Sequence, residues 1–234
     1  MEHYIEKYAI PGSIIIAGLL IGTGVMLSGG VSIGGDFGTS SQNGPQKPET
    51  INPEDISFAP VSEQDHIRGD VAAPITLLEY SDLECPYCQS VHPTLQQLVD
   101  DYEGKVRWVY RHFPLESIHS QARPAAIASE CVAELGGGNA FWAFVDGIFE
   151  DQKTNLPAMR AVALATGVNA SAYDTCVASG KYTQVVDDDI ADGVKAGTTG
   201  TPHTLVLGPD GAIVPLVGAQ PLGAFKAVID EMLK

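Results

Sequence analysis

Two cysteines, Cys85 and Cys88, are separated only by Pro86 and Tyr87. They follow the apolar run 75–80, which predicts a buried strand, and they open a predicted helix with Pro86 in its first turn. Two thiols at this spacing can close a small disulfide, and the partial positive charge at a helix N-terminus stabilises a thiolate on the first. The motif therefore predicts thiol–disulfide exchange, with Cys85 as the nucleophile and Cys88 as the thiol that resolves the intermediate.

The elements around this motif predict an α/β fold. A strand–helix–strand unit comes first, a long helical stretch follows, and a turn sequence (Gly-Pro-Asp-Gly) joins a later pair of strands. This order indicates a mixed sheet flanked by helices, with the helical stretch inserted into the sheet domain. The predicted elements are the strand 75–80, helix 86–102, strand 106–111, helices within 120–196, strands 204–207 and 212–217, and helix 222–233.

The charge balance limits the partners that the chain can bind. The sequence has 13 basic and 29 acidic residues, for a net charge of -16. A surface of this sign repels nucleic acids and anionic lipids, so neither is expected as a partner. Four cysteines in 234 residues are too few for a small fold held together by disulfides.

The N-terminal region predicts a membrane segment. Residues 9–33 contain no charged side chain, and this length is enough to cross a bilayer core. A cleaved signal peptide is the alternative, but only one Lys precedes the segment and no Ala-x-Ala site follows it, so an uncleaved single-pass anchor is favoured. We therefore expect an anchor or signal over 1–35, a flexible polar linker over 36–57 and the catalytic domain over 58–234.

Three stretches together resemble the DsbA-like branch of the thioredoxin superfamily, whose members are extracytoplasmic oxidoreductases. They are Glu79-Tyr80-Ser81-Asp82-Leu83-Glu84-Cys85-Pro86-Tyr87-Cys88, Arg111-His112-Phe113-Pro114-Leu115 and Gly200-Thr201-Pro202. The resemblance runs from about Val61 to the C-terminus. It implies a thioredoxin fold with a helical insertion at about 118–198, and no cofactor.

The resemblance also implies a role for particular residues. Cys85 would be the exposed attacking sulfur, and Cys88 would be less accessible. Pro202 would be the cis-proline of the fold, turning the backbone of Thr201 toward Cys85, where an incoming cysteine-containing strand could pair. Glu79 would be a buried acid that accepts and returns the proton of Cys88; the alternative for Glu79 is a solvated carboxylate on an edge strand.

Two features predict a mild oxidant. Asp82 and Glu84 place negative charge near Cys85, which opposes its thiolate. The redox dipeptide Pro86-Tyr87 lacks the histidine of the most oxidising DsbA proteins.

The direction of exchange stays open between a dithiol oxidase and a reductase or isomerase. The linker is too short and polar for the dimerisation region that isomerases usually carry, which favours an oxidase and a monomer.

An oxidase of this kind would act on exported proteins that contain cysteines. It would be reoxidised by a membrane partner, with its catalytic domain on the extracytoplasmic side of the cell membrane.

The other two cysteines, Cys131 and Cys176, fall in separate predicted helices. They are either a structural disulfide or two buried free thiols, and some DsbA-like relatives carry a second disulfide in this region, which favours the pair. A zinc module built on Cys85 and Cys88 needs a second close pair of ligands, which cysteines 45 positions apart do not supply. No metal site is therefore expected, and His92 and His203 are interpreted as a surface and a partly exposed histidine.

Overall fold

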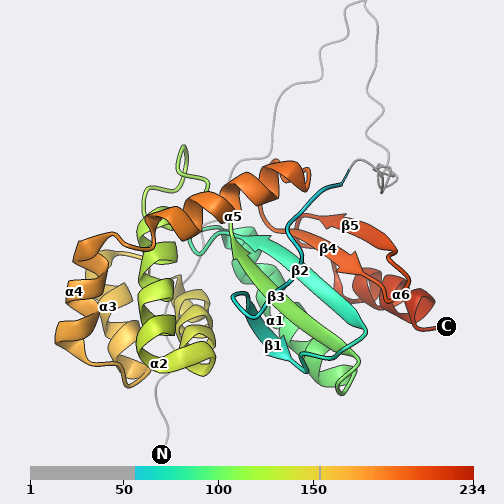
Figure 1. The fold of residues 1–234 in the computed structure, drawn as a ribbon, viewed down its shortest axis with the longest axis horizontal. Coiled ribbons are helices and arrows are strands. Elements are labelled where there is room, and N and C mark those ends of the chain that lie inside the picture. Colours follow the sequence, from blue (N-terminus) through green and yellow to red (C-terminus); the bar gives the residue numbers. More distant parts are fainter. Residues whose placement is uncertain (1–55, 153) are drawn as a thin grey trace, which may run out of the picture. The chain divides into compact units, whose positions relative to one another are not determined.

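The computed structural model describes residues 56–152 and 154–234. These residues form one mixed sheet and a set of helices (Figure 1). The strands are β1 His66–Gly69, β2 Ile75–Ser81, β3 Val106–His112, β4 His203–Leu207 and β5 Ile213–Val217. The helices are α1 Pro86–Asp101, α2 Ala122–Asp151, α3 Leu156–Ala165, α4 Ala170–Ser179, α5 Thr183–Lys195 and α6 Leu222–Met232.

The sheet has the strand order β1-β3-β2-β4-β5. Strands β2 and β3 run parallel, because α1 connects them as a crossover, and every other neighbouring pair is antiparallel. Strand β2 lies at the centre of the sheet and is buried along its whole length. The predicted mixed sheet is therefore confirmed, with one strand, β1, that the sequence analysis did not predict.

Each face of the sheet buries its own set of apolar side chains. Because side chains alternate along a strand, Ile75 and Leu77 of β2 pack into the core beneath α1 and α6, whereas Leu78 packs into a second core on the opposite face, toward α5. Helix α1 contributes Cys88, Val91, His92, Leu95 and Leu98 to the first core, the three- and four-residue spacing of one helix face.

The inserted helical region lies between β3 and β4 in the chain. Helices α2, α3 and α4 gather at one side of the sheet, and α5 leads from this group back across it (Figure 1). Helix α2 is interrupted at Gly137, whose φ of 75° suits glycine because it has no Cβ. A disulfide joins Cys131 of α2 to Cys176 of α4, with Cα atoms 5.8 Å apart.

The predicted anchor at 9–33 lies outside the described residues, as does most of the predicted linker at 36–57. Within 56–152 and 154–234, the helices are all too short or too polar to span a membrane.

A buried ion-pair network holds the α5 face of the sheet together. Arg111 of β3 contacts Asp192 of α5 at 2.6 Å and Asp65 at 2.7 Å. The Tyr80 hydroxyl of β2 donates to the same Asp192 carboxylate. The side chains of Arg111, Asp65 and Asp192 are 5%, 9% and 11% exposed, so loss of either carboxylate leaves the buried Arg111 charge only partly compensated.

We predict that Asp192→Asn lowers the free energy of unfolding by about 3–5 kcal/mol, because Arg111 then keeps a buried charge with one partner fewer. Urea unfolding of the reduced and oxidised chain measures this loss. Asp174→Asn is the matched control, because its ion pair with Arg160 is exposed and should contribute less than about 1 kcal/mol. Equal losses in the two variants would contradict the prediction.

Candidate active site

Helix α1 begins at Pro86, shortly after β2 ends at Ser81, and places both thiols near the C-terminal end of this central strand. Cys85 is the N-cap residue and makes no side-chain capping bond, and Pro86 occupies the first turn. Both cysteines are free thiols. Cys88 is fully buried, one helical turn further along. The loop, cap and first turn therefore hold the two sulfurs in the order that the sequence predicts.

The segment before β4 meets this helix start. The Thr201–Pro202 peptide bond is cis, and the Cys85 sulfur lies 3.5 Å from the Thr201 carbonyl oxygen. The Pro202 carbonyl accepts a hydrogen bond from the backbone N–H of Gly218 at 2.8 Å, which ties the segment to the end of β5. Two motifs more than a hundred residues apart thus form one site.

Cys85 is much less exposed than the sequence predicts. Only 3% of the residue is exposed, because the Thr201 segment lies against its sulfur. Tyr87, in contrast, is 66% exposed and points its ring away from the core. The predicted nucleophile is therefore almost completely covered, whereas the aromatic residue two positions later is exposed.

The pKa values of the two thiols are shifted in opposite directions. The pKa of Cys85 is lowered to about 5, chiefly by a hydrogen bond from the Cys88 thiol, which outweighs the effect of burial. Contacts with Thr201 and the backbone N–H groups of Cys88 and Tyr87 act in the same direction. Burial raises the pKa of Cys88, and the bond to Cys85 raises it further. At neutral pH the site therefore holds a thiolate at Cys85 and a thiol at Cys88.

Asp82 and Glu84, which are predicted to oppose this thiolate, are both held by hydrogen bonds to other parts of the chain. The Asp82 carboxylate accepts hydrogen bonds from the backbone N–H groups of Glu84 and Leu115 and contacts His119 at 2.8 Å. The Glu84 carboxylate accepts from the backbone N–H of Gln121 at 2.6 Å. Both charges are thereby engaged with the loop between β3 and α2, and the pKa of Cys85 falls in their presence.

Glu79 lies in the core beneath Cys88. It is 1% exposed and occupies the face of β2 that packs against α1. Burial raises its pKa to about 7, although hydrogen bonds to the carboxylate work against the shift. The alternative of a solvated glutamate on an edge strand is excluded, because β2 is central and the side chain is buried.

Two residues that the sequence analysis missed hold the Glu79 carboxylate. Ser81 donates its hydroxyl to one oxygen at 2.8 Å, and Trp108 of β3 donates its indole N–H to the other at 3.0 Å. Ser81 also lowers the pKa of Cys88 through a side-chain hydrogen bond, so it lies between Glu79 and the thiol. Its position two residues after Glu79, on the same strand face, was a usable signal.

His92 and His203 were both predicted to be more exposed than they are. His92 is 5% exposed and contacts Asp146 of α2 at 2.7 Å. His203 is 1% exposed, and its Nδ1 lies 2.7 Å from the Thr198 hydroxyl. Each is a buried histidine with a polar partner inside the protein.

The sequence of the chain matches a known protein family over most of its length. The sequence model described as Thioredoxin matches residues 61–230. The chain belongs to the thioredoxin family. The match starts at Val61, where the resemblance to DsbA-like proteins begins, and extends through the last helix.

Solved structures of thioredoxin-family proteins show the same fold. DsbA2 of Pseudomonas aeruginosa superimposes with a TM-score of 0.61 at 27% identity, covering 76% of this chain and 100% of that one. The thiol-disulfide exchange protein alpha-DsbA2 of Wolbachia pipientis has a TM-score of 0.64 at 17% identity and covers 73% and 88%. Oxidised BdbD of Bacillus subtilis has a TM-score of 0.63 at 21% identity and covers 76% and 97%. The fold is therefore that of DsbA proteins.

Curated relatives are similar over part of their length. A stretch of 149 residues is 36% identical to Na(+)/H(+) antiporter NhaA 1 of Mycolicibacterium gilvum, which is 62% of this chain and 24% of the antiporter. A shorter stretch of 96 residues is 44% identical to NhaA 3 of Salinispora tropica, which is 14% of that protein. The chain thus spans less than a quarter of the length of these two relatives.

The thiolate at Cys85 can be titrated directly. We predict that the ultraviolet absorbance of the thiolate in the reduced chain rises with a midpoint near pH 5, because hydrogen bonds from Cys88 and the helix start stabilise the ionised form. The Cys85→Ser variant keeps Cys88, whose pKa is raised, so it should lose this transition, which assigns the transition to Cys85. A midpoint near the ordinary thiol value, about 8.5, would contradict the prediction.

We predict that Glu79→Gln slows the resolution of a mixed disulfide on Cys85 by up to about a hundredfold, because Gln cannot accept the proton of Cys88. In the unmodified chain the rate should fall as the pH drops below about 7, where Glu79 becomes protonated. Stopped-flow decay of a glutathione adduct measures both effects. Glu84→Gln is the control, and it should keep the inflection; an inflection that survives Glu79→Gln would remove Glu79 from the relay.

Proposed function

We propose that this protein is an extracytoplasmic thiol–disulfide oxidoreductase that forms disulfides in exported proteins through the Cys85–Cys88 pair. The observation that carries the proposal is the meeting of the Cys85 sulfur with the cis-proline segment, 3.5 Å from the Thr201 carbonyl oxygen. The pKa of Cys85 is lowered there, and the neighbouring buried Cys88 thiol has a raised pKa. Cys85 can therefore act both as a nucleophile and as a leaving group, whereas Cys88 stays protonated.

Oxidation of a substrate begins with the disulfide form of the pair. A substrate thiolate attacks the Cys85 sulfur, the Cys85–Cys88 bond breaks, and Cys88 leaves with the electron pair and takes a proton. A second substrate thiolate then attacks the substrate sulfur of the mixed disulfide. The substrate disulfide forms, Cys85 leaves as a thiolate, and the pair has gained two electrons.

Glu79 is well suited to supply and recover the proton of Cys88. Its pKa of about 7 lies near neutral pH, where a proton carrier is most effective. The Ser81 hydroxyl, bonded to Glu79 at 2.8 Å, bridges the carboxyl group and the thiol. The backbone of Thr201 would pair with the substrate strand while the sulfurs exchange.

The low pKa of Cys85 favours the oxidase direction. Interactions that stabilise the thiolate exist only in the reduced form, so they make the disulfide easier to reduce and therefore a better oxidant. The neutral Pro86-Tyr87 dipeptide predicts a milder oxidant, because it offers no positive charge to the Cys85 thiolate. The hydrogen bonds to Cys85 come instead from Cys88 and the backbone at the helix start, so they do not require a charged residue in the dipeptide.

Two observations support an extracytoplasmic location. The Cys131–Cys176 disulfide belongs to the class of structural bridges that persist in oxidising compartments. A structure with a TM-score of 0.58 at 19% identity is described as a periplasmic thioredoxin-like protein of Salmonella enterica serovar Typhimurium. The predicted anchor at 9–33 would hold the domain at the membrane surface, close to a partner that reoxidises it.

A zinc module built on the Cys85 and Cys88 pair has no support in the described part of the chain. The one group of three potential ligands found there consists of two histidines and a glutamate and includes neither cysteine. Transfer of two electrons, rather than metal binding, is the chemistry that the cysteine pair supports.

We predict that the Cys85–Cys88 couple, equilibrated with glutathione buffers, has a potential between about −200 and −100 mV, the range of disulfide-forming enzymes. Alkylation of the thiols after quenching measures it. A value near about −270 mV would overturn the oxidase direction in favour of a reductase.

The paired variants Cys85→Ser and Cys88→Ser test the role of each sulfur. With a mixed-disulfide donor and no other thiol present, Cys88→Ser should accumulate an adduct on Cys85, because the thiol that would resolve it is missing. Cys85→Ser should form no adduct and lose exchange activity. Exchange that persists in Cys85→Ser would remove the assigned nucleophile.

A further inference from the structure

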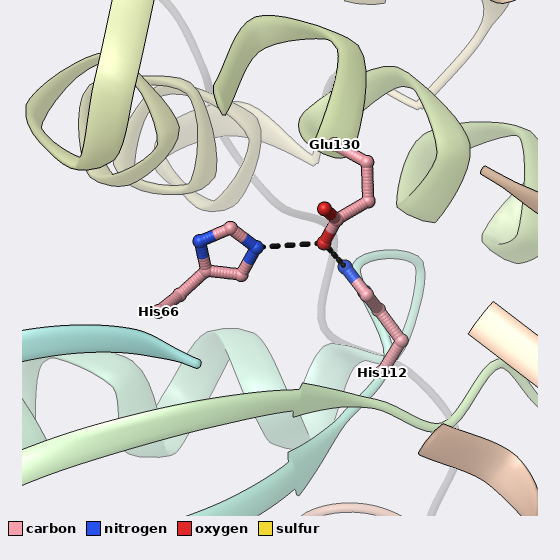
Figure 2. A group of neighbouring side chains, drawn as sticks. All are labelled: His66, His112 and Glu130. Atoms are coloured by element: carbon pink, nitrogen blue, oxygen red, sulfur yellow. Dashed lines mark hydrogen bonds and ion pairs between the residues drawn. The ribbon is translucent and has the colours of Figure 1, made fainter. Parts of the chain in front are cut away.

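Three potential metal ligands converge where the inserted helical region meets the sheet. His66 comes from β1, His112 from β3 and Glu130 from α2. The Glu130 Oε1 atom lies 2.7 Å from His66 Nε2 and 3.0 Å from His112 Nε2, so both rings point at one oxygen (Figure 2). All three ligand atoms lie within 4.8 Å of one another.

These donors suit a divalent transition metal ion. Imidazole nitrogens with a carboxylate oxygen form a common three-residue set for Zn²⁺, which leaves a fourth position for water. Bonds of about 2.0–2.1 Å in a tetrahedron put neighbouring ligand atoms about 3.3 Å apart. The two nitrogen–oxygen separations here are slightly shorter, and the two Nε2 atoms lie within 4.8 Å of each other. Binding of the ion would therefore need the Glu130 oxygen to move outward and the two rings to close around the metal.

The surroundings hold the ligands in place. The His66 ring stacks on Phe141 with ring centroids 3.5 Å apart. The backbone N–H of His112 donates to the Asp189 carboxylate at 2.9 Å. Next to Glu130, Cys131 is fixed by its disulfide to α4. Fixed ligand orientation of this kind is typical of metal sites, which depend on their outer shell.

The cluster also has a route to solvent. His66 lines a pocket of about 650 Å³ together with Gln64, Asp65 and Ala133. The side chains of His66 and Glu130 are 15% and 9% exposed, whereas that of His112 is 1% exposed. An ion could therefore enter beside His66, and water from the pocket could complete its coordination.

We propose that His66, His112 and Glu130 form a binding site for Zn²⁺ or a similar divalent transition metal ion, which cross-links the inserted helical region to the sheet. The ion would bind the two Nε2 atoms and the Glu130 carboxylate in place of the hydrogen bonds between them. The site is separate from the Cys85–Cys88 pair and does not depend on the redox function proposed above.

The test uses the full chain, purified without a polyhistidine tag, treated with chelator and then oxidised so that Cys85 and Cys88 cannot bind zinc. Titration with Zn²⁺ against a chromophoric chelator should give one site per chain. His66→Gln and Glu130→Gln should each weaken binding by more than the roughly 10–100-fold that loss of an outer-shell partner costs. Zinc should also raise the unfolding temperature of the unmodified chain but not that of His66→Gln.

His119→Gln is the matched control. His119 contacts the buried Asp82 carboxylate at 2.8 Å, and its side chain is 15% exposed, the same fraction as that of His66. It should bind zinc like the unmodified chain, and circular dichroism should show that every variant is folded. Absence of saturable binding, or binding that survives both His66→Gln and Glu130→Gln, would overturn the proposal and leave a hydrogen-bonded ion pair.

Discussion

The hydrogen bonds received by the Cys85 sulfur are the interaction on which the site depends. The residue has lost almost all contact with water, so an ionised sulfur needs donors from the protein. The Cys88 thiol and the backbone N–H groups at the start of α1 supply them. Since these donors are fixed by the helix itself, the side chain of Tyr87 is not needed for ionisation and remains 66% exposed, available for contact with another molecule.

Burial acts in the opposite direction on the two groups behind this sulfur. It raises the pKa of Cys88 and of Glu79, because neither has enough polar contacts to compensate for lost hydration. One of the two can lose its proton at moderate cost only while the other keeps it. In the proposed mechanism, a proton passed between Cys88 and Glu79 would keep a single negative charge in this part of the core. The alternation of side chains along β2 places the Glu79 carboxyl group on the face that packs against α1.

Local patterns in the sequence were enough to predict most of the fold and the central pair of cysteines. The predicted strand 75–80 and helix 86–102 agree with β2 and α1 to within one residue at each end. Strand β1 escaped prediction because His-Ile-Arg-Gly has little apolar periodicity and becomes a strand only through its pairing with β3.

The environment of the charged groups could not be predicted for a related reason. Asp82 and Glu84 are adjacent to the motif in sequence, yet each also accepts a hydrogen bond from a residue more than 30 positions away, in the loop before α2. His66 and Glu130 are 64 positions apart, a spacing that no local motif encodes. Sequence proximity to Cys85 therefore gave no indication of the partners that hold the Asp82 and Glu84 carboxylates.

The inserted helical region also positions the active site. Two consecutive residues of α2 secure it, because Glu130 contacts the sheet through His66 and His112, while Cys131 is bonded to α4. Consecutive side chains on a helix point about 100° apart, so α2 is held in two directions at one turn. The loop between β3 and α2 is thereby fixed at both ends, and this loop donates the hydrogen bonds that hold Asp82 and Glu84, which precede Cys85 in the chain. The geometry of Cys85 thus depends on contacts of α2 that lie outside the redox motif.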